Sequence, residues 1–312
     1  MAISAQMESK PVLVHVAFAV LCLFATALAR NGLQVWLEMS QTSEQSSNLW
    51  LIPLISAFLI FERRHAIFAN TRFTPTALLL FPFGLLIDAV SLSTHLSLSE
   101  SDAAVLAIVG FWITVMGAFI ACYGKAAWSQ AKFPLGFLLF AVPMPQVILD
   151  PIVRWLQHGS AAVVNSLFVL LHVSFLRDGL DFYLSGLTIA IAPECSGIRS
   201  SYALLVLTVL LSHLTLRTTW HRVVLVLAVV PLVLLKNGIR IVTLCLLTLH
   251  VDRSVITGPL HHQGGFVFFG LALFVEGALC WLLQRSEVRE RSRSLLSNRN
   301  SNRVAGSLRC SS

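Results

Sequence analysis

Apolar segments long enough to cross a lipid bilayer recur along the whole of this 312-residue chain. A helix needs roughly 20 apolar residues to cross the hydrocarbon core, because it rises only about 1.5 Å per residue. Eight segments come close to this length: 11–30, 47–61, 75–95, 104–123, 133–147, 197–215, 222–249 and 264–283. Backbone amides inside a bilayer must be hydrogen-bonded within the protein, and a helix does this by itself. The sequence therefore predicts an all-α, polytopic membrane protein with about eight transmembrane helices.

The composition excludes most soluble classes of protein. Hydrophobic residues make up 56% of the chain and charged residues only 12%. The net charge of +7 does not indicate nucleic-acid binding, because the basic residues lie in short loops between apolar segments and in the C-terminal tail. The six cysteines form no CxxC pair, so no zinc site or disulfide framework is expected, and no cofactor is predicted.

The basic residues also predict the orientation of the chain. Cytoplasmic loops are rich in Lys and Arg, which places Lys10, the loop after the second apolar segment and the Arg-rich C-terminus inside. Both termini are cytoplasmic only if residues 146–194 enter and leave the membrane on the outer side, with 160–176 as an interfacial or re-entrant helix. If 160–176 crosses instead, the chain has nine spans and its termini lie on opposite sides.

Two regions follow from this pattern. Residues 1–284 carry all the apolar segments and are predicted to form a single transmembrane domain. Residues 285–312 are rich in Ser, Arg and Asn and contain little to bury. We expect a basic, disordered cytoplasmic tail there, or one that lies against anionic headgroups, so membrane lipids are expected partners.

Cys195 is the first candidate for chemistry. It lies in the sequence PECSGIR (residues 193–199), at the entrance to the apolar segment 197–215. A thiol beside a guanidinium and helix N-terminal amides is favoured as the nucleophilic thiolate. Arg199 lies one turn further on the same face and would provide this guanidinium. The alternative is that Arg199 serves only as an interfacial anchor. Four cysteines within apolar segments lack such neighbours and are interpreted as inert: Cys22, Cys122, Cys245 and Cys280.

Arg240 is the second candidate, because it lies inside the apolar segment 222–249, in the sequence KNGIR (residues 236–240). An arginine inside a bilayer costs about 2.5 to 3.5 kcal/mol on insertion scales. Such a residue is expected only where it lines a watery cavity, takes part in chemistry or has a structural partner. Asp181 and Glu194 are the candidates for such a partner.

His261 and His262 precede the last apolar segment, in the sequence LHHQGG (residues 260–265). The glycines leave room for a bound peptide chain, although the same sequence would suit an ordinary interfacial loop. Metal binding is not favoured, because neighbouring side chains diverge and no third ligand stands at a suitable spacing. The predicted orientation places this pair at the same membrane face as Cys195.

These three motifs, in this order, resemble the exosortase and archaeosortase family of membrane transpeptidase-like enzymes. The matching sequences are ECSGIRS at 194–200, NGIRI at 237–241 and LHHQGG at 260–265. The segment FLLFAVPMP at 137–145 also looks like the family's, so the resemblance covers roughly residues 50–285. The combination is specific, whereas each motif alone is weak.

The resemblance implies a site of one cysteine, one arginine and one histidine. Cys195 matches the family's nucleophile and Arg240 its catalytic arginine. His261 is preferred to its neighbour as the catalytic histidine, because it lies four residues before Gly265 as in the family's motif. Three further residues occupy supporting positions: Arg199, Asn237 and His262.

The resemblance also implies a substrate and a location. Enzymes of this family cleave C-terminal sorting signals of exported proteins, typically a motif such as Pro-Glu-Pro before a transmembrane helix and a basic tail. The expected activity is that of a cysteine protease or transpeptidase at the periplasmic face of the bacterial inner membrane. Its thiolate would form an acyl-enzyme thioester, which either water or an amine acceptor releases.

Two other functions fit the same residues. In a transporter or flippase, Arg240 and Arg199 would bind an anionic lipid or glycan, and Cys195 would be incidental. In a noncatalytic scaffold for envelope polysaccharide assembly, none of these side chains would be needed beyond folding. The sequence has no apparent internal repeat, which disfavours a transporter built from duplicated halves.

Overall fold

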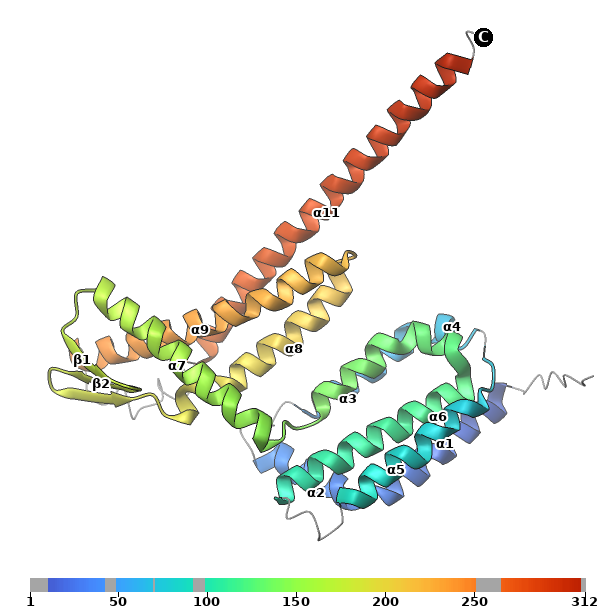
Figure 1. Cartoon of the computed structure of the whole chain (residues 1–312), viewed down its shortest axis with the longest axis horizontal. Coiled ribbons are helices and arrows are strands. Elements are labelled where there is room, and N and C mark those ends of the chain that lie inside the picture. Colours follow the sequence, from blue (N-terminus) through green and yellow to red (C-terminus); the bar gives the residue numbers. More distant parts are fainter. Residues whose placement is uncertain (1–10, 43–48, 70, 92–98, 251–264, 310–312) are drawn as a thin grey trace, which may run out of the picture. The chain divides into compact units, whose positions relative to one another are not determined.

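The computed structural model describes residues 11–42, 49–69, 71–91, 99–250 and 265–309. Most of these residues lie in helices, so the prediction of a mainly helical fold is confirmed. Internal contacts divide the chain into two units, Met1–Asp150 and Pro151–Ser312. Figure 1 shows the helices of both units and a small sheet that belongs to the second.

The first unit is built from helices packed around α6. Its elements are α1 (Pro11–Leu28), α2 (Arg30–Thr42), α3 (Leu51–Glu62), α4 (Arg64–Ile67), η1 (Pro75–Leu79), α5 (Leu80–Ser91), α6 (Glu100–Phe137) and η2 (Leu138–Ala141). Tyr123 of α6 packs among the rings of Phe18, Phe68 and Phe119. Its hydroxyl lies 2.9 Å from Nδ1 of His15, so a hydrogen bond joins α1 to α6 within the apolar core.

α6 consists of two helices that meet at Gly124. The φ angle of Gly124 is 82°, a value that favours glycine. The indole nitrogen of Trp112 donates to the carbonyl of Leu135 at 3.1 Å, so the two halves lie side by side, and Figure 1 shows the chain turning back between them. The predicted segment 104–123 corresponds to the first half, and the segment 133–147 begins in the second.

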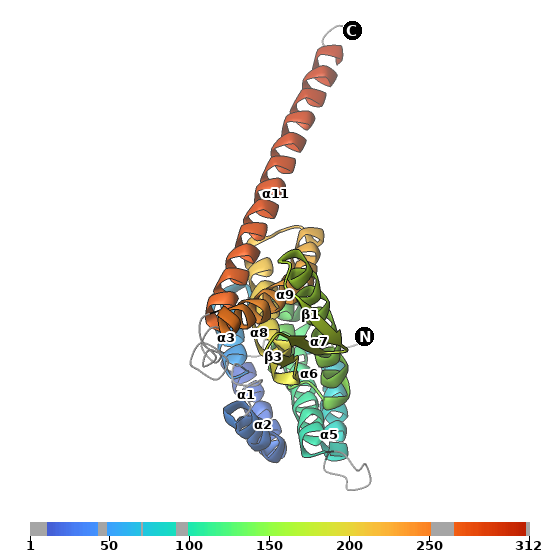
Figure 2. The ribbon, with the colours of Figure 1, turned by 90° about the vertical axis from the view of Figure 1, so that its left-hand side faces the viewer.

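The second unit contains four long helices, a sheet and a short turn of 3-10 helix. Its elements are α7 (Gln146–Leu170), β1 (Phe175–Asp178), β2 (Asp181–Leu184), β3 (Leu187–Ala190), η3 (Pro193–Ser196), α8 (Ile198–Thr215), α9 (Thr219–His250) and α11 (Gly265–Arg309). α8, α9 and α11 pack against one another, as Figure 2 shows from the side. A buried cluster joins them to α7: Leu156, Leu204, Val229, Val233 and Ala272.

The sheet is antiparallel, in the order β1-β2-β3, and packs against α7. Two-residue loops containing Gly179 and Gly186 connect the strands, and both glycines have positive φ. Phe182 of β2 is only 1% exposed, and its ring contacts that of Phe168 in α7. This contact anchors the sheet to the end of the helix.

The sheet corrects the all-α prediction, and it also shortens the expected helix at 160–176, of which residues 160–170 are helical. Helix α7 ends at Leu170, and the chain enters β1 at Phe175. Glycines in two-residue loops are a hairpin signal that the sequence does carry. The high hydrophobicity of the surrounding segments favoured a helical interpretation, because short apolar strands and buried helices have similar composition.

Four helices in the described part of the chain are long and apolar enough to cross a membrane: Asp102–Ala141, Ile198–Thr215, Thr219–His250 and Gly265–Arg293. The bent pair α1 and α2 makes a fifth if it counts as one span. The predicted count of eight is therefore not confirmed, and α7 is not among these helices. α3, for example, has 12 residues and rises only about 18 Å, less than the hydrocarbon thickness.

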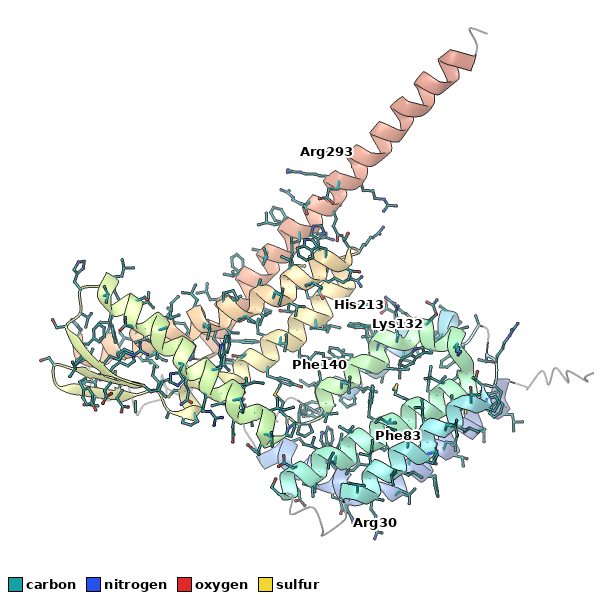
Figure 3. All side chains as sticks on the ribbon, in the orientation of Figure 1. Arg30, Phe83, Lys132, Phe140, His213 and Arg293 are labelled. Carbon is teal, nitrogen blue, oxygen red and sulfur yellow. The ribbon has the colours of Figure 1, made fainter. Side chains whose placement is uncertain are left out.

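Large apolar side chains project outward from many helices, as in a protein that contacts lipid. Phe83 of α5, labelled in Figure 3, is 53% exposed. Phe58 of α3 and Phe274 of α11 are exposed as well. Exposed large apolar side chains on many helices are expected where a protein contacts lipid.

α11 continues beyond the apolar segment. It runs to Arg309, so the structure has a helix where the composition of residues 285–312 predicts disorder. Near its middle, Glu287 accepts hydrogen bonds from the backbone amides of Arg217 and Thr218, at 3.1 and 2.8 Å. These bonds tie α11 to the loop between α8 and α9.

The single transmembrane domain over 1–284 stays a prediction.

Candidate active site

The predicted site residues that the structure describes all belong to the second unit. Cys195 lies in η3, Arg199 in the first turn of α8, and Asn237 and Arg240 in α9. The two predicted histidines, His261 and His262, lie outside the described residues.

Cys195 occupies a turn between β3 and α8. Pro193 begins η3, and the amide of Cys195 donates to the carbonyl of Ala192 at 2.9 Å. Gly197 ends the turn in the left-handed conformation, with φ of 74°, and α8 starts at the next residue. The half-buried cysteine therefore sits just outside the N-terminus of α8, where its side chain packs against the core shared by α7, α9 and the sheet.

Asn237 holds this turn from α9. Its Nδ2 donates to the carbonyl of Cys195 at 2.8 Å and to the hydroxyl of Ser160 in α7 at 3.0 Å. The orientation of the amide follows from chemistry, because a carbonyl oxygen can only accept. Asn237 is completely buried, so it connects three elements inside the protein. Its contact with the cysteine is to the main chain.

A second bond from α7 supports the same turn. Nε2 of Gln157 donates to the carbonyl of Ile191 at 2.7 Å, just after the end of β3. Gln157 and Ser160 are three residues apart on one face of α7, and both are buried. The sequence interpretation missed them, although two polar residues at helical spacing in an apolar segment were the available signal. They position the chain that leads into the cysteine turn.

A third contact comes from Lys236, the residue before Asn237. Its ammonium donates to the hydroxyl of Ser200 in the first turn of α8, and that hydroxyl donates to the carbonyl of Gly197 at 3.0 Å. Lys236 is only 7% exposed. Neither Lys236 nor Ser200 was predicted as a site residue. The available signal was a lysine four residues before an intramembrane arginine.

The two arginines differ in their surroundings. Arg240 is half-buried and lies three residues after Asn237 and four after Lys236, so it shares their side of α9 and extends one turn beyond them. Arg199 is exposed, one turn after Cys195. The structure thus brings the cysteine turn together with Asn237 and Lys236 and places Arg240 within one helical turn of that contact.

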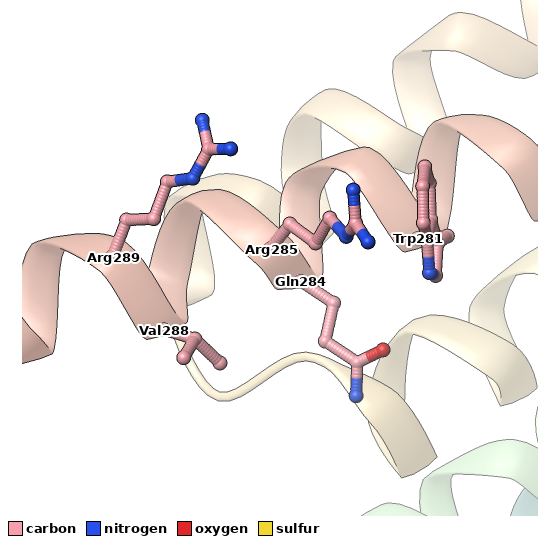
Figure 4. Close-up of a pocket in the computed structure, with 5 residues that line it drawn as sticks. All are labelled: Trp281, Gln284, Arg285, Val288 and Arg289. Atoms are coloured by element: carbon pink, nitrogen blue, oxygen red, sulfur yellow. The ribbon is translucent and has the colours of Figure 1, made fainter.

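A cavity of about 440 Å³ lies elsewhere in this unit, on α11 (Figure 4). It is lined by Trp281, Gln284, Arg285, Val288 and Arg289. The guanidinium of Arg285 stacks on the ring of Trp281 at 3.8 Å. The lining contains no nucleophile and no predicted site residue. Tryptophan and arginine at the end of an apolar segment are typical of a membrane interface.

No group of three or more His, Cys, Asp or Glu residues that could hold a metal ion occurs among the described residues.

Gly197→Ala is expected to destabilise the turn and to lower activity. An added Cβ would lie 2.9 Å from Oδ1 of Asn237, and the left-handed backbone costs a residue with a side chain about 1 to 2 kcal/mol. Thermal unfolding of the purified chain should show this loss. Gly136→Ala is the matched control, because nothing lies within 4 Å of its Cβ position. Equal stability of the two variants would contradict the prediction.

A family model described as transmembrane exosortase matches residues 36–276, which is most of the chain and includes every predicted site residue. No curated protein and no solved structure matches the chain significantly.

Proposed function

Because this chain belongs to the transmembrane exosortase family, we propose that it is a cysteine transpeptidase or protease of the bacterial inner membrane. Its substrates are exported proteins that carry a C-terminal sorting signal. The observation that carries the proposal is the hydrogen bond from Asn237 to the carbonyl of Cys195. This bond joins two motifs that lie 42 residues apart, as a single site built from both motifs requires.

The proposed reaction begins with the thiolate of Cys195. Its sulfur forms a bond to the scissile carbonyl carbon, and Arg240 stabilises the oxyanion that develops. The C–N bond then breaks as His261 gives a proton to the leaving amine. The product is an acyl-enzyme thioester. Attack by water releases a carboxylic acid, whereas attack by an amine acceptor forms a new amide. In both cases the attacking group gives a proton back to His261 and the thiolate of Cys195 is regenerated.

The position of Cys195 suits a substrate that is itself anchored in the membrane. The cysteine lies just before α8, a helix long and apolar enough to span, which supports a position for it at the boundary of the bilayer. A sorting signal such as Pro-Glu-Pro directly before a transmembrane helix would reach the same depth. By the distribution of Lys and Arg, this boundary faces the periplasm and both termini are cytoplasmic.

A transporter or a scaffold is less well supported. Neither function requires the cysteine turn to be held by Asn237 and the chain on either side of it by Gln157 and Lys236. Such preorganisation is expected where a reacting atom must be placed within a fraction of an ångström.

Thiol labelling in membranes tests the proposal. We expect a membrane-impermeant maleimide, added from the periplasmic side, to label Cys195 at a pH below the usual thiol range near 8.5. Labelling should stop the processing of exported proteins that carry C-terminal signals in the native cell. The buried cysteines Cys122, Cys245 and Cys280 should remain unlabelled.

A Cys195→Ala variant serves as the control for labelling. If the labelled protein processes its substrates at the unlabelled rate, the nucleophile assignment is wrong.

A further inference from the structure

A buried lysine beside the cysteine turn has no part in the reaction proposed above. Lys236 lies within the apolar part of α9, where a charged side chain is costly and usually marks a functional site. It is 7% exposed, and its ammonium reaches across to Ser200 on α8. The hydroxyl of Ser200 in turn donates to the carbonyl of Gly197, two residues after Cys195.

The carbonyl of Gly197 is the point where these bonds converge. It accepts from the hydroxyls of Ser200 and Ser201, at 3.0 and 2.7 Å, and from the amide of Ser201 at 2.9 Å. The chain of bonds therefore runs from the ammonium of Lys236 to the peptide that ends the cysteine turn. A positive charge is held close to that turn by a hydrogen-bonded, partly buried connection.

The spacing of charges on α9 favours an anionic group beside the ammonium. Lys236 and Arg240 lie one helical turn apart, and like charges at this spacing repel each other. A thiolate beside the first turn of α8 would offset the repulsion. Among the other groups near the turn, Gln157 and Ser160 of α7 are neutral and Arg199 of α8 is positive. The carboxylate of Glu194 precedes Cys195 in the chain, so the test below follows the cysteine itself.

We propose that Lys236 is a positioning residue for the Cys195 thiolate, acting through Ser200. Its ammonium orients the first turn of α8 and favours the charged form of the cysteine. This inference rests on the proposed role of Cys195 as nucleophile. It gives a role to Lys236, the lysine of the KNGIR sequence, which lies one helical turn before Arg240.

The pH dependence of Cys195 alkylation tests this role. The full chain in lipid nanodiscs is reacted with iodoacetamide across a pH series, and Cys195 modification is followed by mass spectrometry. Lys236→Gln keeps a hydrogen-bond donor but removes the charge, so its alkylation midpoint should rise by about one pH unit, with roughly tenfold slower labelling at pH 7. Lys236→Arg, which keeps the charge, should stay close to the unmodified chain.

Two further variants make the result decisive. Lys132→Gln is the matched control, since this lysine is exposed in the first unit, and its midpoint should not change. Ser200→Ala removes the bridging hydroxyl with little change in volume and should raise the midpoint in the same direction as Lys236→Gln. It keeps the test valid if the lysine variants fail to fold.

Unchanged midpoints in both folded Lys236→Gln and Ser200→Ala would overturn the inference. The midpoint can be measured whether or not the chain cleaves a substrate. Continued processing by Cys195→Ala would instead reject the proposed function, so the two failures are distinguishable.

Discussion

Replacing Cys195 with alanine is expected to abolish processing, by a factor of about 10³ or more, because the acyl-enzyme cannot form without the sulfur. Uncleaved precursors of exported proteins should accumulate in the membrane. The variant should still fold, since Asn237 bonds to the carbonyl of residue 195 and alanine keeps that carbonyl. Immunoblots of precursor and mature forms, with thermal unfolding of the purified variant, measure both outcomes.

The matched control is Cys280→Ala. Cys280 is buried in α11, where its sulfur lies 3.1 Å from the hydroxyl of Thr215. Its removal should leave processing close to that of the unmodified chain. A stable Cys195→Ala variant that continues to process its substrates would reject a cysteine mechanism. It would then favour the transporter or the scaffold.

Arg240→Lys is expected to reduce processing about 10²-fold, although it keeps the positive charge. A guanidinium presents several hydrogen-bond donors in one plane, whereas the ammonium of lysine is a compact charge at the end of a shorter side chain. Loss of one donor to a developing oxyanion commonly costs a factor of about 10² to 10³. The rate of precursor cleavage at saturating substrate measures this effect.

Arg285→Lys is the control for Arg240→Lys, because Arg285 lies on α11 and lines a cavity without predicted site residues. It should retain full processing. If Arg240→Lys is as active as this control, Arg240 is a structural residue and has no role in stabilising the oxyanion. A transporter for an anionic lipid would also be sensitive to Arg240→Lys, but it would tolerate Cys195→Ser.

The helical character of the chain could be predicted because it depends on local composition. Each predicted apolar segment contains or overlaps a helix, for example 197–215 with α8 and 222–249 with α9. The number of spans could not be predicted in the same way. Whether a short apolar helix such as α3 crosses the membrane depends on its neighbours as well as on its own residues.

The sheet between α7 and α8 was missed for a related reason. Its strands are four residues long, too short for alternation to stand out in an apolar chain. What stabilises them is packing, such as the contact between Phe182 and Phe168, which joins residues from separate elements. Strand formation of this kind depends on side-chain packing more than on intrinsic preference.

Residue types and their order along the chain were enough to predict the helical membrane class, the family resemblance and three candidate site residues: Cys195, Asn237 and Arg240. The bond from Asn237 to the main chain of Cys195 and the bond from Lys236 to Ser200, 36 residues away, could be seen only in the folded protein. Such bonds depend on how far each helix is rotated about its own axis and which neighbour it faces. Packing of the whole unit sets that rotation, and no single segment encodes it.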